Sequence, residues 1–142
     1  MHELFYCSYA KKDISDQDIL DILEVSRKNN SELDITGLLL YWDKTHQFLQ
    51  ILEGDKKSIF ELYSKICDDP RHSSLKLIYD GEISERGFKG WSMAFKDLKE
   101  VDTSKICGFS DFAISGFTNE RTEAEASRAV NLIKSFRNLL PS

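Results

Sequence analysis

The sequence predicts an α+β fold in which two helices cover one face of a sheet, with a helical extension at the C-terminus. Apolar and amphipathic patterns through residue 95 occur in the order strand, helix, strand, strand, helix, strand, strand. That order is the split β-α-β pattern of ferredoxin-like folds (βαββαβ) with one further strand. The hairpin within it excludes a doubly wound parallel sheet, and the interspersed helices exclude a β-sandwich.

The first strand and helix are marked clearly. Residues 4–9 are apolar and aromatic, and a polar run follows them. Ser15 is a good N-cap, and apolar residues at helical spacing then predict a helix over residues 16–28. Asn29 and Asn30 follow, and asparagine is common just past a helix end, so we expect the helix to stop there.

The second half of the sheet contains a hairpin and a second helix. Residues 35–41 and 48–52 are apolar runs joined by a short polar connection, which predicts two antiparallel strands. Asp55 is a candidate N-cap for a helix that ends before Pro70, because proline cannot continue it. Further strands are expected at residues 75–79 and 91–95.

Residues 99–142 differ in character from residues 1–98, so we expect two units. The tail holds as many basic as acidic residues, whereas the whole chain has a net charge of -5. Thr122 and Glu125 have capping-box spacing. Apolar residues then line one helix face: Ala126, Ala129, Val130, Ile133, Phe136 and Leu140. We expect this helix to cover the sheet, to contact another subunit, or both.

Composition excludes several functional classes. The chain has 142 residues, 41% of them hydrophobic, so it can bury a core as a single domain. Its acidic balance argues against nucleic-acid binding, and no apolar run is long enough to cross a membrane. The N-terminus lacks a signal peptide, and three scattered cysteines form no Cys-x-x-Cys pair, so we expect a cytoplasmic protein without disulfides.

The usual signatures of enzymes are missing. The sequence has no Gly-rich phosphate loop, no Gly-x-Ser-x-Gly and no His-Glu-x-x-His. Its three histidines are too scattered to predict a metal site. Cys7 lacks a sequence cue for an activating base, which favours a packing role. We therefore expect neither catalysis nor a bound metal.

Gln50 is unusual for its position, because it is a polar residue within an apolar strand and shares a strand face with Phe48 and Leu52. A buried amide without partners costs about 1–3 kcal/mol, so Gln50 either points to solvent or has dedicated partners. Tyr6 on the first strand and Asn30 raise the same question, and each taken singly is compatible with simple packing.

Several pieces taken in order resemble the BLUF family, the blue-light sensors that hold a flavin. The Gln-containing strand that ends in Glu53-Gly54 is the most specific piece. The matches are Tyr6-Cys7-Ser8, Asn29-Asn30, Ile35-Thr36-Gly37, Phe48 to Gly54, Asp69-Pro70-Arg71-His72 and Trp91-Ser92-Met93. They extend over about residues 3–97, as in the short, single-domain members of that family.

The resemblance implies a ferredoxin-like domain with the flavin ring between the two helices. It implies that Tyr6 donates an electron and a proton in light, that Gln50 bridges the Tyr6 hydroxyl and the flavin, and that Asn30 binds the polar ring edge. Ile22 is suited to pack on the ring face. Four residues would approach the outer edge, the ribityl chain or the phosphate: Lys65, Asp69, Arg71 and His72. The family often has arginine at the position of Lys65, and lysine lacks its fork geometry.

The function implied is photosensing without turnover. Gln50 would be left in a changed orientation or tautomer after light, and Trp91 and Met93 would pass that change on. These two share a face of the last predicted strand, so only one can lie beside Gln50 at a time, and the sequence leaves open which. FAD is the expected cofactor, with FMN or riboflavin as alternatives. A homo-oligomer and a downstream protein partner are expected.

Two other functions are alternatives to light sensing. One is a flavin-free ferredoxin-like interaction module that has lost light sensing. The other is a small acylphosphatase-like enzyme, which would need Arg and Asn near the first strand, where Tyr9-Ala10-Lys11 stands instead. An absorption spectrum separates all three.

Overall fold

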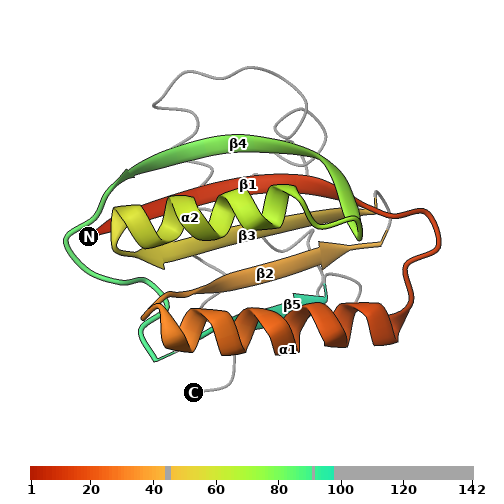
Figure 1. Cartoon of the computed structure of the whole chain (residues 1–142), viewed down its shortest axis with the longest axis horizontal. Coiled ribbons are helices and arrows are strands. Elements are labelled where there is room, and N and C mark those ends of the chain that lie inside the picture. The colour runs from red at the N-terminus through yellow and green to blue at the C-terminus, as the bar shows by residue number, and fades with distance from the viewer. Residues whose placement is uncertain (44–45, 91, 98–142) are drawn as a thin grey trace, which may run out of the picture.

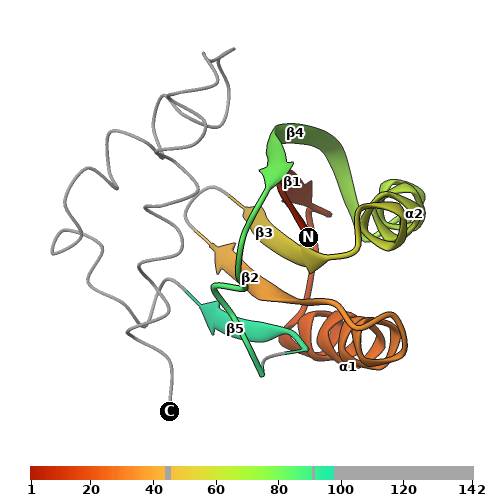
Figure 2. The same ribbon diagram turned by 90° about the vertical axis from the view of Figure 1, so that its left-hand side faces the viewer.

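The computed structural model describes residues 1–43, 46–90 and 92–97 and shows one five-stranded sheet with two helices on a single face (Figures 1 and 2). The expected helix over the tail residues and the position of Trp91 lie outside the described residues. The elements are β1 (His2–Ala10), α1 (Asp16–Glu32), β2 (Thr36–Trp42), β3 (Gln47–Gly54), α2 (Lys56–Cys67), β4 (His72–Glu82) and β5 (Ala94–Asp97).

The strand order β4-β1-β3-β2-β5 confirms the predicted ferredoxin-like arrangement. β1 pairs antiparallel with both β3 and β4, and β2 and β3 form the expected antiparallel hairpin. β5 adds to the β2 edge in parallel register. Helix α2 lies over β1 and β3, and helix α1 lies on the β2–β5 side of the same sheet face (Figure 1). Side chains that point from the strands toward the helices form the floor of any site between α1 and α2.

Helix α1 begins where the sequence predicted and ends later. Ser15 forms a capping box with Asp18, whose backbone amide donates to Ser15 Oγ at 3.1 Å. The expected end at Asn29 and Asn30 is wrong, because the helix runs on to Glu32. The chain reverses at Asp34 instead, whose φ of 54° lies in the left-handed region that Asp tolerates. Asn30 is thus a buried residue of the last helical turn.

Helix α2 follows the prediction closely. The Asp55 side chain accepts from the Ser58 amide at 3.3 Å and caps the N-terminus. Ile59 and Leu62 are buried beneath it. The helix ends at Cys67, ahead of Pro70, so the loop that carries Asp69 leaves the helix directly toward β4.

The last strand begins three residues later than predicted, at Ala94. Side chains of α1 take up the carbonyls that a longer strand would use: Asn30 Nδ2 donates to Ser92 O at 2.6 Å and Arg27 Nε to Met93 O at 3.1 Å. The expectation that Trp91 and Met93 share a strand face is therefore wrong, because Met93 precedes the strand.

Both faces of the sheet are buried. Leu4, Leu39 and Leu52 belong to the core beneath the helices, together with Tyr6 and Phe48. The alternate residues point to the opposite face and are fully buried, among them Phe5, Leu38, Leu40, Leu49 and Ile51. Neither described helix covers that face (Figure 2). Among the described residues, no helix combines the length and apolar composition needed to cross a membrane.

Candidate functional site

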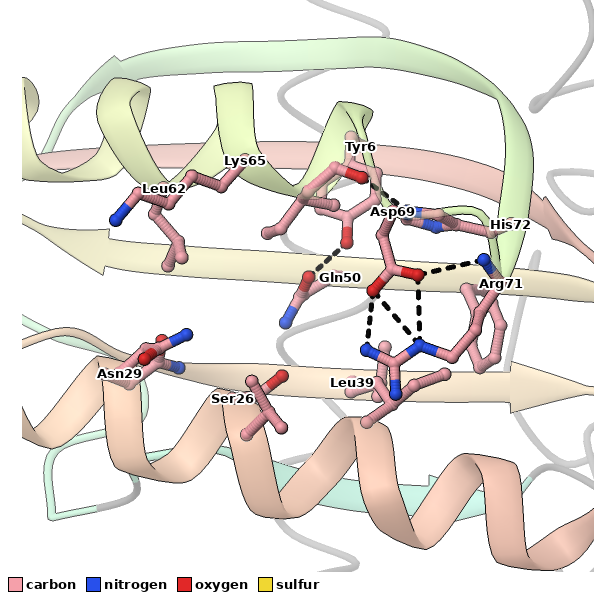
Figure 3. A pocket seen from close by; sticks show the side chains of 15 residues that line it. Tyr6, Ser26, Asn29, Leu39, Gln50, Leu62, Lys65, Asp69, Arg71 and His72 are labelled. Atoms are coloured by element: carbon pink, nitrogen blue, oxygen red, sulfur yellow. Dashed lines mark hydrogen bonds and ion pairs between the residues drawn. The ribbon is translucent and has the colours of Figure 1, made fainter.

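A cavity of about 190 Å³ lies between the two helices and opens above β1 and β3 (Figure 3). It brings together all eight residues that the sequence singled out for cofactor binding: Tyr6, Ile22, Asn30, Gln50, Lys65, Asp69, Arg71 and His72. They come from five different elements and two loop positions, so the fold alone makes them neighbours. Met93 does not line the cavity and contacts it through Gln50.

Tyr6 and Gln50 face each other directly across the β1–β3 pairing. The Tyr6 hydroxyl donates a hydrogen bond to Gln50 Oε1, and both side chains are buried (Figure 3). Burial raises the pKa of Tyr6 well above its usual value, and the nearby Tyr63 and Cys67 raise it further. The phenol therefore keeps its proton across the physiological range and is available only as a neutral donor.

The NH₂ group of the Gln50 side chain donates a hydrogen bond to a methionine sulfur. Gln50 Nε2 donates to Met93 Sδ at 3.4 Å, so both ends of the Gln50 amide have partners in this structure. Gly37 lies close against the neighbouring strand, because a Cβ there would lie 2.0 Å from Ile51 O. Met93 therefore lies beside Gln50, and Trp91 is outside the described residues.

Asn30 supplies an acceptor without a partner. Its Nδ2 group donates to Ser92 O, but its buried Oδ1 has no hydrogen-bond partner among the residues that the structure describes. A buried acceptor left unpaired is costly, about 1–3 kcal/mol. Because Asn30 lines the cavity, this oxygen is placed to accept from a polar N–H of a bound ring.

Asp69 and Arg71 form a fork at one side of the cavity (Figure 3). Arg71 Nη2 donates to Asp69 Oδ2 at 2.6 Å and Arg71 Nε to Asp69 Oδ1 at 3.0 Å. The hydrogen bonds from Arg71 hold the pKa of Asp69 below its usual value, and Asp69 raises the pKa of Arg71. The pair therefore stays ionised and presents little net charge to the cavity.

His72 is held by two partners beside Tyr6. Its Nε2 lies 2.7 Å from Ile66 O, which can only accept, so this nitrogen carries the proton. Its Nδ1 lies at hydrogen-bonding distance from Ser8 Oγ, 2.9 Å away. Its ring packs edge-on against Tyr6, with centroids 6.5 Å apart. His72 thus fixes the wall next to the phenol.

Seven further lining residues were missed by sequence reasoning: Val25, Ser26, Asn29, Leu39, Phe48, Leu62 and Ile66. The sequence could have predicted two of them, because Ser26 and Asn29 follow Ile22 at i+4 and i+7 and so share its helix face. The others gave no signal, because apolar residues on strands and helices are ordinarily core. Five of the seven are apolar: Val25, Leu39, Phe48, Leu62 and Ile66.

The donor set suits a flat apolar ring with a polar edge. Ile22 and Leu62 come from opposite helices and form apolar walls of the cavity, and Gln50 and Asn30 line the same cavity with their amides. Lys65 on α2 also lines the cavity and adds a cation. The described residues contain no group of three His, Cys, Asp or Glu placed to hold a metal ion.

Comparisons with known proteins agree with this geometry. The family model BLUF, sensors of blue-light using FAD, matches residues 1–94. The photoactivated adenylate cyclase subunit beta of Euglena longa is 36% identical over 91 residues, 63% of this chain and 10% of that protein. The blue light- and temperature-regulated antirepressor BluF of Escherichia coli (strain K12) is 30% identical over 96 residues, 68% of this chain and 23% of that protein.

Solved structures show the same likeness at full length. BlrB, a BLUF protein in its dark state, has a TM-score of 0.75 and 28% identity, with 94% of this chain and 95% of that chain covered. BlsA in its photo-activated state has a TM-score of 0.76 and 27% identity, with 98% and 93% covered. The chain thus spans a small part of the two curated relatives named above but nearly all of these two structures.

Proposed function

The chain belongs to the BLUF family of blue-light sensors, and from that membership we propose that it holds a flavin between α1 and α2 and reports light through Gln50. The observation that carries this proposal is the buried chain of contacts from Tyr6 through Gln50 to Met93. It joins a proton donor in the cavity to a side chain outside it, which is what a light-driven switch needs.

The cavity residues would hold the ring in complementary ways. Asn30 Oδ1 would accept a hydrogen bond from a ring N–H, which would satisfy its present lack of a partner. Ile22 and Leu62 would pack on the two ring faces. The cavity is smaller than the roughly 300 Å³ at which pockets for drug-sized ligands begin. We therefore expect the ring to be enclosed and the rest of the cofactor to extend outward.

FAD is the cofactor we propose, with FMN or riboflavin as alternatives. Lys65 would serve the ribityl or phosphate groups as a point charge. Arg71 would contribute less charge, because Asp69 already neutralises it. Retention of the three flavins in gel filtration, with and without the Lys65→Gln change, measures how much the phosphate contact contributes.

A bound flavin supplies absorption of blue light and an acceptor for one electron. Tyr6 would then lose an electron, and its phenolic proton would leave along its hydrogen bond to Gln50 Oε1. Both would return to Tyr6, so no net reaction occurs. Gln50 would be left with its amide turned or tautomerised, and its donation to Met93 Sδ would be lost. The change in the bond to Met93 is the signal.

We propose that the output acts through a partner protein, with this chain as the sensor. The relatives named above include a cyclase subunit and an antirepressor, so outputs differ within the family. The free thiols of Cys7 and Cys67 fit a cytoplasmic location.

The tail is proposed to cover the sheet face opposite the helices or to contact a second subunit. Phe5, Leu38 and Ile51 on that face are fully buried, although neither described helix covers it. A chain cut after about Lys99 should bind flavin and respond to light, yet be less soluble or form a smaller assembly. Light scattering in line with size-exclusion chromatography, in dark and light, measures this. Unchanged mass and solubility would rule out both roles.

The function itself is tested by absorption spectroscopy of the purified full chain. We expect oxidised flavin and a small red shift under blue light that reverses in the dark. Asn30→Ala should weaken flavin retention, with Ser31→Ala on the exposed side of the same turn as a control. A chain that is colourless and takes up no FAD on refolding would instead support the flavin-free interaction module.

A further inference from the structure

Glu53 is a buried carboxylate that the proposed photochemistry does not use. It is 0% exposed and accepts three hydrogen bonds. Two come from consecutive backbone amides, Gly87 N at 2.6 Å and Phe88 N at 2.9 Å, and the third from Thr36 Oγ1 at 3.1 Å. A buried charge with this many donors is strongly fixed in place, because leaving any of them unpaired is costly.

Arg86 completes the same anchor. Its Nη1 donates to Thr36 Oγ1 at 2.9 Å and to Glu53 O at 3.0 Å, and its Nη2 donates to Asp34 O at 2.8 Å. A hydrogen-bonded chain therefore runs from Arg86 through the Thr36 hydroxyl to the Glu53 carboxylate. Three successive residues of the β4–β5 connection, from Arg86 to Phe88, are therefore hydrogen-bonded to the open end of the β2–β3 hairpin, where Thr36 pairs with Glu53.

The β4–β5 connection, held by Glu53 at Gly87 and Phe88, continues to Met93, which accepts the hydrogen bond from Gln50. Phe88 is fully buried, and Met93 follows five residues later, within a span of at most about 17 Å of extended chain. Gln50 and Glu53 lie on the same strand, and their odd spacing places them on opposite faces. Strand β3 thus holds this connection twice, at Phe88 from one face and at Met93 from the other.

We propose that Glu53 is a positioning residue for light sensing: by anchoring Gly87 and Phe88 it sets where Met93 Sδ meets the Gln50 amide. The proposal rests on the proposed function of Gln50 as the light switch. Asn30 and Arg27 add a second attachment at Ser92 O and Met93 O. The anchor at Glu53 fixes the approach of the chain, and the α1 side chains fix its end.

The chemistry requires a carboxylate at this position. Its two oxygens accept from three donors, and each oxygen has more than one lone pair. A glutamine has one acceptor oxygen, and its NH₂ group would face a donor, such as the Gly87 amide. Glu53→Gln therefore keeps the size of the side chain while it releases at least one backbone anchor. Glu85→Gln is the matched control, because Glu85 is an exposed carboxylate in the same connection.

The experiment uses methyl-labelled methionine in the full chain. Met93 and Met1 are the only two methionines, so the spectrum has two methyl signals. We expect Glu53→Gln to move or broaden the Met93 signal in the dark and to leave the Met1 signal in place. We also expect dark recovery to slow by about 2- to 10-fold, the range that one net hydrogen bond supports. Glu85→Gln should change neither.

An unchanged Met93 signal and an unchanged recovery rate in Glu53→Gln would overturn the proposal. If that variant does not fold, Thr36→Val tests the same anchor, because it keeps the branched shape and removes the hydroxyl. It should shift the Met93 signal in the same direction, and an unaltered signal would overturn the proposal. The dark methyl signal needs no photoreaction, so a chain that fails to respond to light would refute the proposed function and still test the anchor.

Discussion

Tyr6 on β1 and Gln50 on β3 are register partners, and the Tyr6 hydroxyl donates to Gln50 Oε1. Antiparallel pairing therefore creates the hydrogen bond, because side chains of directly opposed residues lie close on one sheet face. The same Gln50 amide donates to Met93 Sδ. Each proposed step of light sensing depends on one of these two hydrogen bonds, and substitutions at the three residues test them separately.

Tyr6→Phe should keep flavin bound and abolish the red-shifted state. The ring packing is preserved, and the electron and proton donor is lost. The change leaves Gln50 Oε1 without its donor, so the free energy of unfolding should fall by about 1–3 kcal/mol. Light-minus-dark absorption and urea denaturation measure the two effects. A variant with a normal photocycle would show that Tyr6 is not the donor.

Gln50→Ala should also abolish the shift, because the amide that joins Tyr6 to Met93 is gone. Some flavin should remain bound, since the apolar walls and Asn30 are unchanged. Gln17→Ala is the control, because Gln17 is an exposed glutamine on α1. Light-minus-dark absorption is again the measurement, and an ordinary photocycle in Gln50→Ala would contradict the role assigned to the amide.

Met93→Leu should preserve the red shift and change its lifetime. Leucine has a similar volume and lacks the sulfur acceptor, so packing is retained while the hydrogen bond from Gln50 Nε2 is lost. The dark orientation of Gln50 is then less stable, and dark recovery should slow by about 2- to 10-fold. Recovery followed at the red edge of the flavin band measures this. Total loss of the shift with flavin bound would place Met93 in the photochemistry itself.

Alkaline pH offers a test of the Tyr6 environment. Burial raises the pKa of Tyr6 in the folded chain above its unfolded value of 10.0. The resulting stability is complete below pH 10 and is lost as the pH rises toward the folded pKa, because only the unfolded chain releases the proton. The difference in unfolding free energy between wild type and Tyr6→Phe should therefore shrink above pH 10. A difference that is constant through pH 11 would contradict a protonated, buried phenol.

The order of elements could be predicted because each has a clear period and clear end signals, such as Ser15, Asp55 and Pro70. The end of α1 could not be predicted. Asparagine is a common residue at a helix end, but Asn30 is instead buried in the last turn, where it donates a hydrogen bond to Ser92 O. The start of β5 depends on the same contact. Local sequence does not encode which carbonyls a distant helix will bind.

The sequence predicted most polar residues of the candidate site, but Ile22 is the only one of its apolar wall residues that it predicted. Gln50 stood out because a polar group in an apolar strand needs a reason, and Tyr6 and Asn30 stood out through their joint occurrence with it in a family pattern. Leu39 and Leu62 gave no such signal, since their pattern is that of any core residue. The position of Met93 beside Gln50 depends on how the β4–β5 connection returns to the sheet, which only the folded chain reveals.

The central claim is that light changes the hydrogen bonds of the Gln50 amide. Light-minus-dark infrared spectroscopy of the flavin-loaded full chain, with glutamine side chains isotopically labelled, tests it most directly. The chain has three glutamines, and only one that changes contributes to a difference spectrum. We predict a label-sensitive side-chain band that shifts in light and is absent from Gln50→Ala. A flavin red shift without any label-sensitive band would contradict the claim.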